Sequence, residues 1–111
     1  MKLEVWDDAG SDKVKTFMSD QMLTQKIRVV NELGLHTRPA TLIVKLLQEC
    51  RSEVTFTYKK QTIDARSILN ILMLAAPKNA QITVTVTGVD AEETMKRLEE
   101  CFKSRFGEDG S

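Results

Sequence analysis

The only histidine of the chain, His36, lies in the segment Gly34-Leu35-His36-Thr37-Arg38-Pro39-Ala40. Gly34 allows a sharp turn, and Pro39 fits the first turn of a helix, where a missing N–H costs nothing. The imidazole is therefore predicted at a helix N-terminus, where N–H groups without intrahelical partners and the positive end of the helix dipole point outward. The segment predicts an anion site around a nucleophilic ring nitrogen.

A phosphoryl group is the anion that suits this arrangement. Bonded to a ring nitrogen of His36, it would accept hydrogen bonds from the backbone N–H groups of Thr37 and Arg38. The Arg38 guanidinium would add charge-assisted bonds to the phosphoryl oxygens. The plainer alternative is a solvated histidine at a helix start, and spacing alone does not decide between the two.

Ser67 is a second residue whose position matters. It precedes the apolar run from Ile68 to Leu74, and its hydroxyl is predicted to cap a short helix by accepting a backbone N–H. A helix that is apolar nearly all round either buries every side or shows a patch to a partner. We expect Ile71 and Leu74 in the core.

The elements that must position these residues follow from hydrophobic periodicity. Alternation predicts a short strand at 26–29, a hairpin over 53–65 and a strand over 82–87. Helical spacing predicts a helix from the Pro39 turn to about Cys50, another over 68–74 and a third through Phe106, the third with an Asp90-x-x-Glu93 start that resembles a capping box. The order β-α-β-β-α-β-α predicts an α+β open-faced sandwich, in which three helices cover one face of a four-stranded antiparallel sheet.

The chain has 111 residues, 41% of them hydrophobic and 29% charged, which favours one globular domain. Residues 1–25 have weak periodicity, although Val14, Phe17 and Met18 would share one face of a helix. We predict an N-terminal extension over 1–25, flexible or partly helical, a domain over 26–107 and a C-terminal tail over 108–111.

Charge and cysteine content restrict the function further. Sixteen basic residues balance sixteen acidic ones, so nucleic acid is not expected as a partner. No apolar run approaches the roughly 20 residues of a membrane span, and no secretory signal is visible, so we expect a cytoplasmic protein that does not bind membranes. Cys50 and Cys101 lack the paired spacing of a zinc site and are predicted to be reduced, with no metal and no cofactor.

Gly-Leu-His-Thr-Arg-Pro-Ala resembles the active-site signature of the HPr family, the histidine phosphocarriers of phosphoenolpyruvate-dependent phosphotransferase systems. The resemblance extends from Lys26 to Gly107, and the family fold has the element order that periodicity predicts. The segment 65–74 is similar to the family's regulatory-serine motif, at the family's spacing from the histidine. Ser67 matches that serine.

This resemblance implies a phosphocarrier rather than an enzyme. Enzyme I, charged by phosphoenolpyruvate, would phosphorylate His36, which would donate to an enzyme IIA-type domain. Arg38 and Thr37 would support the phosphoryl group, and a serine kinase or phosphorylase would act on Ser67. A docking patch is implied at Ile68, Leu69 and Leu72, bordered by Arg38, Thr41 and Lys45. Because a carrier must release its partners, we expect a small interface and a monomer.

Departures from the family pattern bear on the branch. Sugar-transport members often carry Asn before the motif glycine and a glycine after the regulatory helix, where this chain has Leu33 and Ala75. Asn31-Glu32-Leu33-Gly34, Leu72-Met73-Leu74 and the segment 102–109 are more similar to the nitrogen-related branch, NPr. Many members begin near Met22, so residues 1–21 are either a true extension or an artefact of the assigned start.

Two rival functions stay open at this point. One is a regulatory binding module of the same fold that is switched by phosphorylation of Ser67 and carries no phosphoryl flux. The other is a plain α+β domain that binds a small ligand. The presence of His36 in its motif argues against the first, and the second needs a concave apolar lining.

Overall fold

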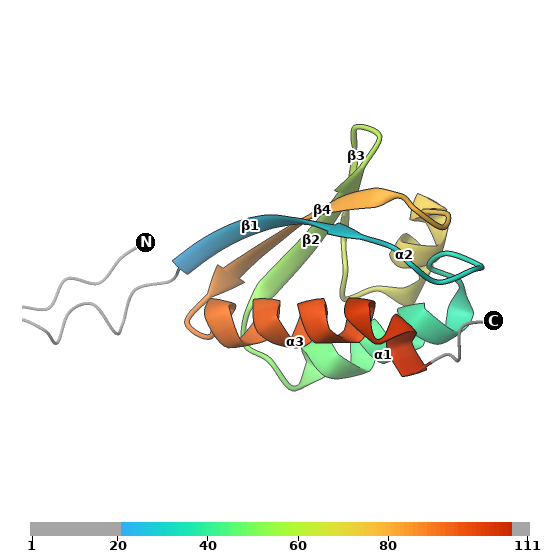
Figure 1. The fold of residues 1–111 in the computed structure, drawn as a ribbon. Coiled ribbons are helices and arrows are strands. Elements are labelled where there is room, and N and C mark those ends of the chain that lie inside the picture. The colour runs from blue at the N-terminus through green and yellow to red at the C-terminus, as the bar shows by residue number, and fades with distance from the viewer. Residues whose placement is uncertain (1–20, 108–111) are drawn as a thin grey trace, which may run out of the picture.

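The computed structural model describes residues 21–107, which form a four-stranded antiparallel sheet with three helices packed on one face (Figure 1). The elements are β1 (Gln21–Arg28), α1 (Thr37–Gln48), β2 (Glu53–Tyr58), β3 (Gln61–Asp64), α2 (Ile68–Leu74), β4 (Gln81–Gly88), α3 (Ala91–Lys103) and a 3₁₀ turn (Arg105–Gly107). The strands lie in the order β1-β4-β2-β3. This architecture confirms the predicted open-faced sandwich.

The core forms because alternate strand residues point toward the helices. In β4, Ile82, Val84 and Val86 are fully buried, whereas the threonines between them face the open side of the sheet. Phe56 of β2 and Phe102 of α3 meet edge to face, with 6.1 Å between ring centroids. Sheet and helices therefore share one hydrophobic core.

The first strand is longer than predicted. It begins at Gln21 rather than at Lys26 and pairs with β4 in unbroken register, from Gln21 opposite Gly88 to Arg28 opposite Gln81. Most of its side chains are exposed, so the alternation that marks a half-buried strand is missing. Residues 21–25, assigned above to the extension, thus belong to the sheet. The rest of that extension, with Val14, Phe17 and Met18, and the tail over 108–111 lie outside the described residues.

The end of the third helix also differs from the prediction. α3 ends at Lys103, and Arg105 and Phe106 follow in the left-handed region, each with φ of 55°. This turn buries the Phe106 ring and brings its centroid to 4.9 Å from the centroid of the Phe102 ring. Burial of an aromatic side chain favours the turn over another helical residue.

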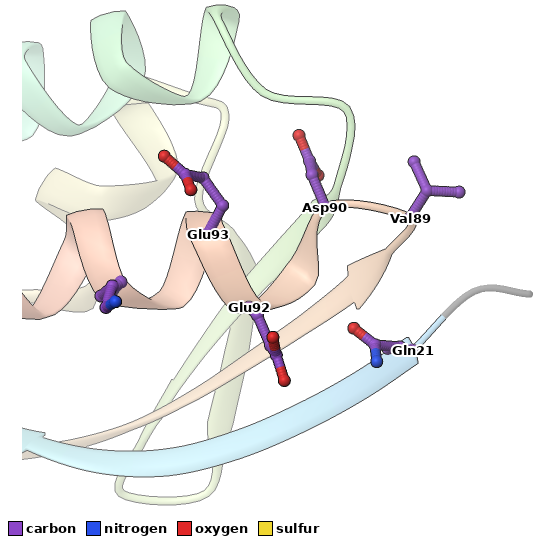
Figure 2. Close-up of a pocket in the computed structure, with 6 residues that line it drawn as sticks. Gln21, Val89, Asp90, Glu92 and Glu93 are labelled. Carbon is purple, nitrogen blue, oxygen red and sulfur yellow. The ribbon is translucent and has the colours of Figure 1, made fainter. Parts of the chain in front are cut away.

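Asp90 precedes α3, but the predicted capping box is wrong. The Asp90 carboxylate accepts hydrogen bonds from the backbone N–H of Arg51, at 2.9 Å, and from the Ser52 hydroxyl, and points toward the α1–β2 connection (Figure 2). Burial raises the pKa of the Asp90 carboxyl, but its hydrogen bonds, chiefly those from Ser52 and the Arg51 N–H, together lower it by more, so its pKa lies below the usual range. Asp90 therefore joins two connections at the end of the fold where β1 begins.

Candidate functional site

His36 is the N-cap of α1, at the position that the sequence predicts. Its backbone is extended, with φ of −86° and ψ of −164°, and its carbonyl accepts the first helical hydrogen bond from Ala40 N–H at 3.0 Å. The N–H groups of Thr37 and Arg38 precede that bond, so they lie at the positive end of the helix dipole without an intrahelical acceptor. His36 is half-buried, and Thr37 and Arg38 are exposed. An anion bound to the imidazole would meet donors from this helix end.

The loop that leads into α1 lies directly against the segment that follows α2. Gly34 has φ of +68°, and a Cβ atom at this position would lie 2.2 Å from the carbonyl oxygen of Ala76. Leu35 N–H donates to the same oxygen at 3.0 Å. The predicted turn is confirmed, and the need for glycine comes from this close approach as well as from the positive φ.

Two contacts that the sequence analysis did not identify hold the same loop. Asn31 is 1% exposed, and its amide donates to the Arg105 carbonyl at 2.9 Å. The Lys78 ammonium pairs with the Glu32 carboxylate at 2.6 Å, and this hydrogen bond and charge lower the pKa of Glu32. The partners are 74 and 46 residues apart in sequence, so no local pattern marks them.

Ser67 caps α2 as predicted. Its hydroxyl oxygen accepts from Asn70 N–H at 3.2 Å. The neighbouring Arg66 guanidinium donates to the carbonyls of Leu47 at 3.1 Å and Ser52 at 2.6 Å, at the C-terminal end of α1 and just beyond it. These bonds fix the start of α2 relative to α1.

The apolar residues of α2 divide between the core and the surface. Ile71 and Leu74 are buried, as predicted. The side chains at the surface are Leu69, 64% exposed, Ile68, 37% exposed, and the half-buried Leu72, together with Met73, 61% exposed, which the sequence analysis did not single out. Thr41 and the exposed Lys45 follow Thr37 along α1, and the Thr41 hydroxyl donates to the Thr37 carbonyl at 2.8 Å. The loop before α1 and helix α2 lie at the same end of the molecule (Figure 1).

A hollow of about 470 Å³ opens at the other end of the fold, where β1 and α3 begin (Figure 2). Its lining is polar and largely acidic: Gln21, Val89, Asp90, Glu92, Glu93 and Lys96. An acidic lining repels a phosphoryl group, so this hollow is not part of the site around His36.

Within residues 21–107, no group of three or more His, Cys, Asp or Glu side chains could hold a metal ion. No helix in that range is long and apolar enough to cross a membrane.

Comparisons with known proteins agree with this geometry. The family model described as "PTS HPr component phosphorylation site" matches residues 23–104. The chain is 44% identical over 91 residues to the phosphocarrier protein HPr of Chlamydia muridarum, covering 82% of this chain and 88% of that protein. It is 35% identical over 88 residues to the phosphocarrier protein HPr of Xylella fastidiosa, which covers 79% of this chain and 99% of that protein. The crystal structure of HPr-C-His from Thermoanaerobacter tengcongensis matches with a TM-score of 0.75 at 30% identity. The match covers 78% of this chain and 98% of the other.

The family match, together with the open-faced sandwich and the histidine at the start of its first helix, identifies a phosphocarrier rather than a catalytic enzyme. The chain belongs to the HPr family, the phosphocarriers of the phosphotransferase system. The names of its relatives give the family alone, so membership of the nitrogen-related branch stays a prediction.

We predict that Gly34→Ala lowers the stability of the protein by about 3 kcal/mol, because the new Cβ atom overlaps the Ala76 carbonyl in a left-handed conformation. Gly107→Ala is the matched control: Gly107 has φ of +81°, but nothing lies within 4 Å of a Cβ atom there. The Gly107→Ala variant should lose only the stability that the left-handed backbone conformation costs a residue with a Cβ atom, about 1–2 kcal/mol. Chemical denaturation measures both, and equal losses would contradict the close approach at Gly34.

Proposed function

We propose that His36 accepts a phosphoryl group from enzyme I, charged by phosphoenolpyruvate, and donates it to a histidine of an enzyme IIA-type domain. The observation that carries this proposal is the position of His36 as the N-cap of α1, beside the N–H groups of Thr37 and Arg38. In uptake, a ring nitrogen of His36 attacks phosphorus in line, and the bond between phosphorus and the donor breaks as the P–N bond forms. Donation is the same exchange with His36 as the leaving group, and it needs no cofactor.

Electrostatic support is the main requirement of such a transfer, because charge spreads over the equatorial oxygens of the phosphoryl group. The Thr37 and Arg38 N–H groups supply fixed donors, and the exposed Arg38 guanidinium supplies a mobile positive charge. An exposed guanidinium can meet a group that arrives on another protein. We therefore assign Arg38 and Thr37 to support of the transferred group.

Partner docking is proposed at the apolar side chains of α2, Ile68, Leu69 and Leu72, with Thr41 and Lys45 of α1 at the border. The exposed Leu69 supplies apolar area, and the exposed Lys45 supplies charge. A short helix and a few neighbours make a small interface, which suits a carrier that must dissociate after each transfer. The monomeric state stays a prediction.

Ser67 is proposed as a regulatory phosphorylation site. Its hydroxyl lies at the start of α2, beside the docking residues Ile68 and Leu69. Arg66 donates to backbone carbonyls near the end of α1, so its charge is already engaged. A phosphate on Ser67 would add negative charge to a face that a partner must desolvate, and partner binding would weaken.

The first test is His36→Ala. This variant should fold with a near-normal thermal midpoint, since a half-buried loop side chain contributes little packing, but it should take no label from phosphoenolpyruvate and enzyme I. Wild-type label should be acid-labile and base-stable, as expected of phosphohistidine. Acid-labile label on the variant would sink the assignment. A wild-type protein that binds its partners yet takes no phosphate would favour the regulatory binding module.

Arg38→Ala should slow phosphoryl transfer to and from His36 by tenfold to a thousandfold, which corresponds to about 1.5–4 kcal/mol of lost transition-state stabilisation. Rapid-quench measurements of uptake and donation give these rates. Lys45→Ala, which removes a charge further along α1, is the matched control and should affect partner affinity more than the rate at saturation. An unchanged transfer rate in Arg38→Ala would remove Arg38 from the site.

Ser67→Asp should fold but take up phosphate more slowly, because aspartate can cap α2 while its charge opposes docking. Ser67→Ala should lose about 1 kcal/mol of stability with the cap, and should take up phosphate normally from saturating enzyme I. Enzyme I-dependent uptake and thermal stability of both variants separate the two roles of Ser67. Wild-type uptake by Ser67→Asp would leave only the capping role.

A further inference from the structure

The exposed large hydrophobic side chains of the described residues fall into two groups. Leu33 precedes α1, and Ile68, Leu69 and Met73 belong to α2, at one end of the fold. Met22 near the start of β1 and Val89 just after β4 belong to the opposite end (Figures 1 and 2). Leu33 is 74% exposed, more than any of the others. A single exposed apolar side chain is ordinary, but a group of them around one site indicates a contact surface.

Leu33 is presented by a rigid turn. The residue before it, Glu32, is paired with Lys78, and the residue after it, Gly34, donates its N–H to the Asn31 carbonyl at 3.1 Å. Gly34 is also pressed against the Ala76 carbonyl, where no larger residue fits. The turn therefore holds the backbone of Leu33 in a fixed place, so little conformational entropy of this turn is lost when a partner covers the leucine.

The loop that carries Leu33 lies against the segment that follows α2. Leu35 N–H bonds to the carbonyl of Ala76, and the preceding residue, Ala75, is the C-cap of α2. Met73 lies in the last turn of that helix, one turn after Leu69. The loop that carries Leu33 therefore passes the C-terminal end of α2, where Met73 lies, on its way to His36. We call Leu33, Leu69 and Met73 the loop–helix patch.

A partner that exchanges a phosphoryl group with His36 must come close to this turn. Reacting atoms have to approach to about 3–3.5 Å, and a specific interface covers about 800 Å² on each partner, a disc of about 16 Å radius. Leu33 is at most about 11 Å along the chain from His36. A partner seated over His36 and α2 therefore covers Leu33.

We propose that Leu33 is a specificity-determining contact, taken up by an apolar pocket that a partner protein carries beside its own reactive group. This inference rests on the phosphocarrier function proposed above and adds the chemistry of the partner's surface. A partner with polar groups at that place would bury them against leucine without replacing their hydrogen bonds to water. Partners suited to a polar residue before the motif glycine are thus disfavoured, and partners with an apolar pocket are favoured.

Leu33→Asn tests this inference in transfer assays with enzyme I and with the IIA-type domain of the same organism. The KM for each protein partner should rise by about tenfold or more, with kcat at saturation nearly unchanged, because Leu33 is not among the groups assigned to the transferred phosphoryl group. The thermal midpoint should also stay nearly unchanged, because Leu33 is exposed and lies outside the core. Leu33→Met, which keeps an apolar side chain, should behave nearly as the wild type. Val89→Asn is the matched control, since Val89 is an exposed apolar residue at the far end of the fold.

Wild-type KM values for Leu33→Asn with both partners would overturn the inference while the phosphocarrier function stands. A lower kcat at unchanged KM would also overturn it, since the leucine would then act on the chemistry. A rise in KM for one partner alone supports the inference for that partner. Should the wild-type protein take no phosphate, the proposed function fails, and calorimetric titration of enzyme I into wild type and Leu33→Asn still measures whether the leucine contributes to binding.

Discussion

The site depends on the close approach of Gly34 to the carbonyl of Ala76. A Cβ atom would lie 2.2 Å from that oxygen, so the loop before α1 can lie against the end of α2 only because residue 34 has no side chain. The contact sets the entry of the chain into α1 and thereby the place of His36 at its N-terminus. It also brings the loop against the C-terminal end of α2, so His36 and the proposed docking residues lie at the same end of the fold.

That shared surface suits a carrier better than a catalyst. The chemistry around His36 consists of helix N–H groups and the exposed Arg38, all of which act on charge rather than on protons. A phosphocarrier has to meet a donor and an acceptor in turn, and both must reach the same histidine. A rigid, shallow face of a few apolar side chains meets that need, because it orients each partner without holding it.

The rest of the fold supports the site from a distance. Asn31 binds the carbonyl of Arg105, in the turn that returns Phe106 to the core beside Phe102. Arg66 joins the start of α2 to the end of α1. Segments from the beginning, middle and end of the domain thus converge around one loop, so a change in core packing under that loop would be felt at His36.

Most of the fold and the position of the candidate site can be predicted from the sequence, because the patterns that indicate them are local. The alternation in β4, the helical spacing in α1 and α3, the Ser67 cap and the turn at Gly34 each lie within a few residues, and together they predict the sandwich and the anion site at His36. The N-terminal half of β1, the role of Asp90 and the end of α3 were predicted wrongly, since each involves a distant partner: β4 for the strand, Ser52 for the carboxylate, and Asn31 for the turn after α3, where its amide binds the Arg105 carbonyl. The exposure of Leu33 is likewise a tertiary property, because it depends on the path of the loop across the end of α2. The sequence by itself thus determines the fold and the place of His36 at a helix start, and only the packing of distant segments decides which side chains surround that histidine at the surface.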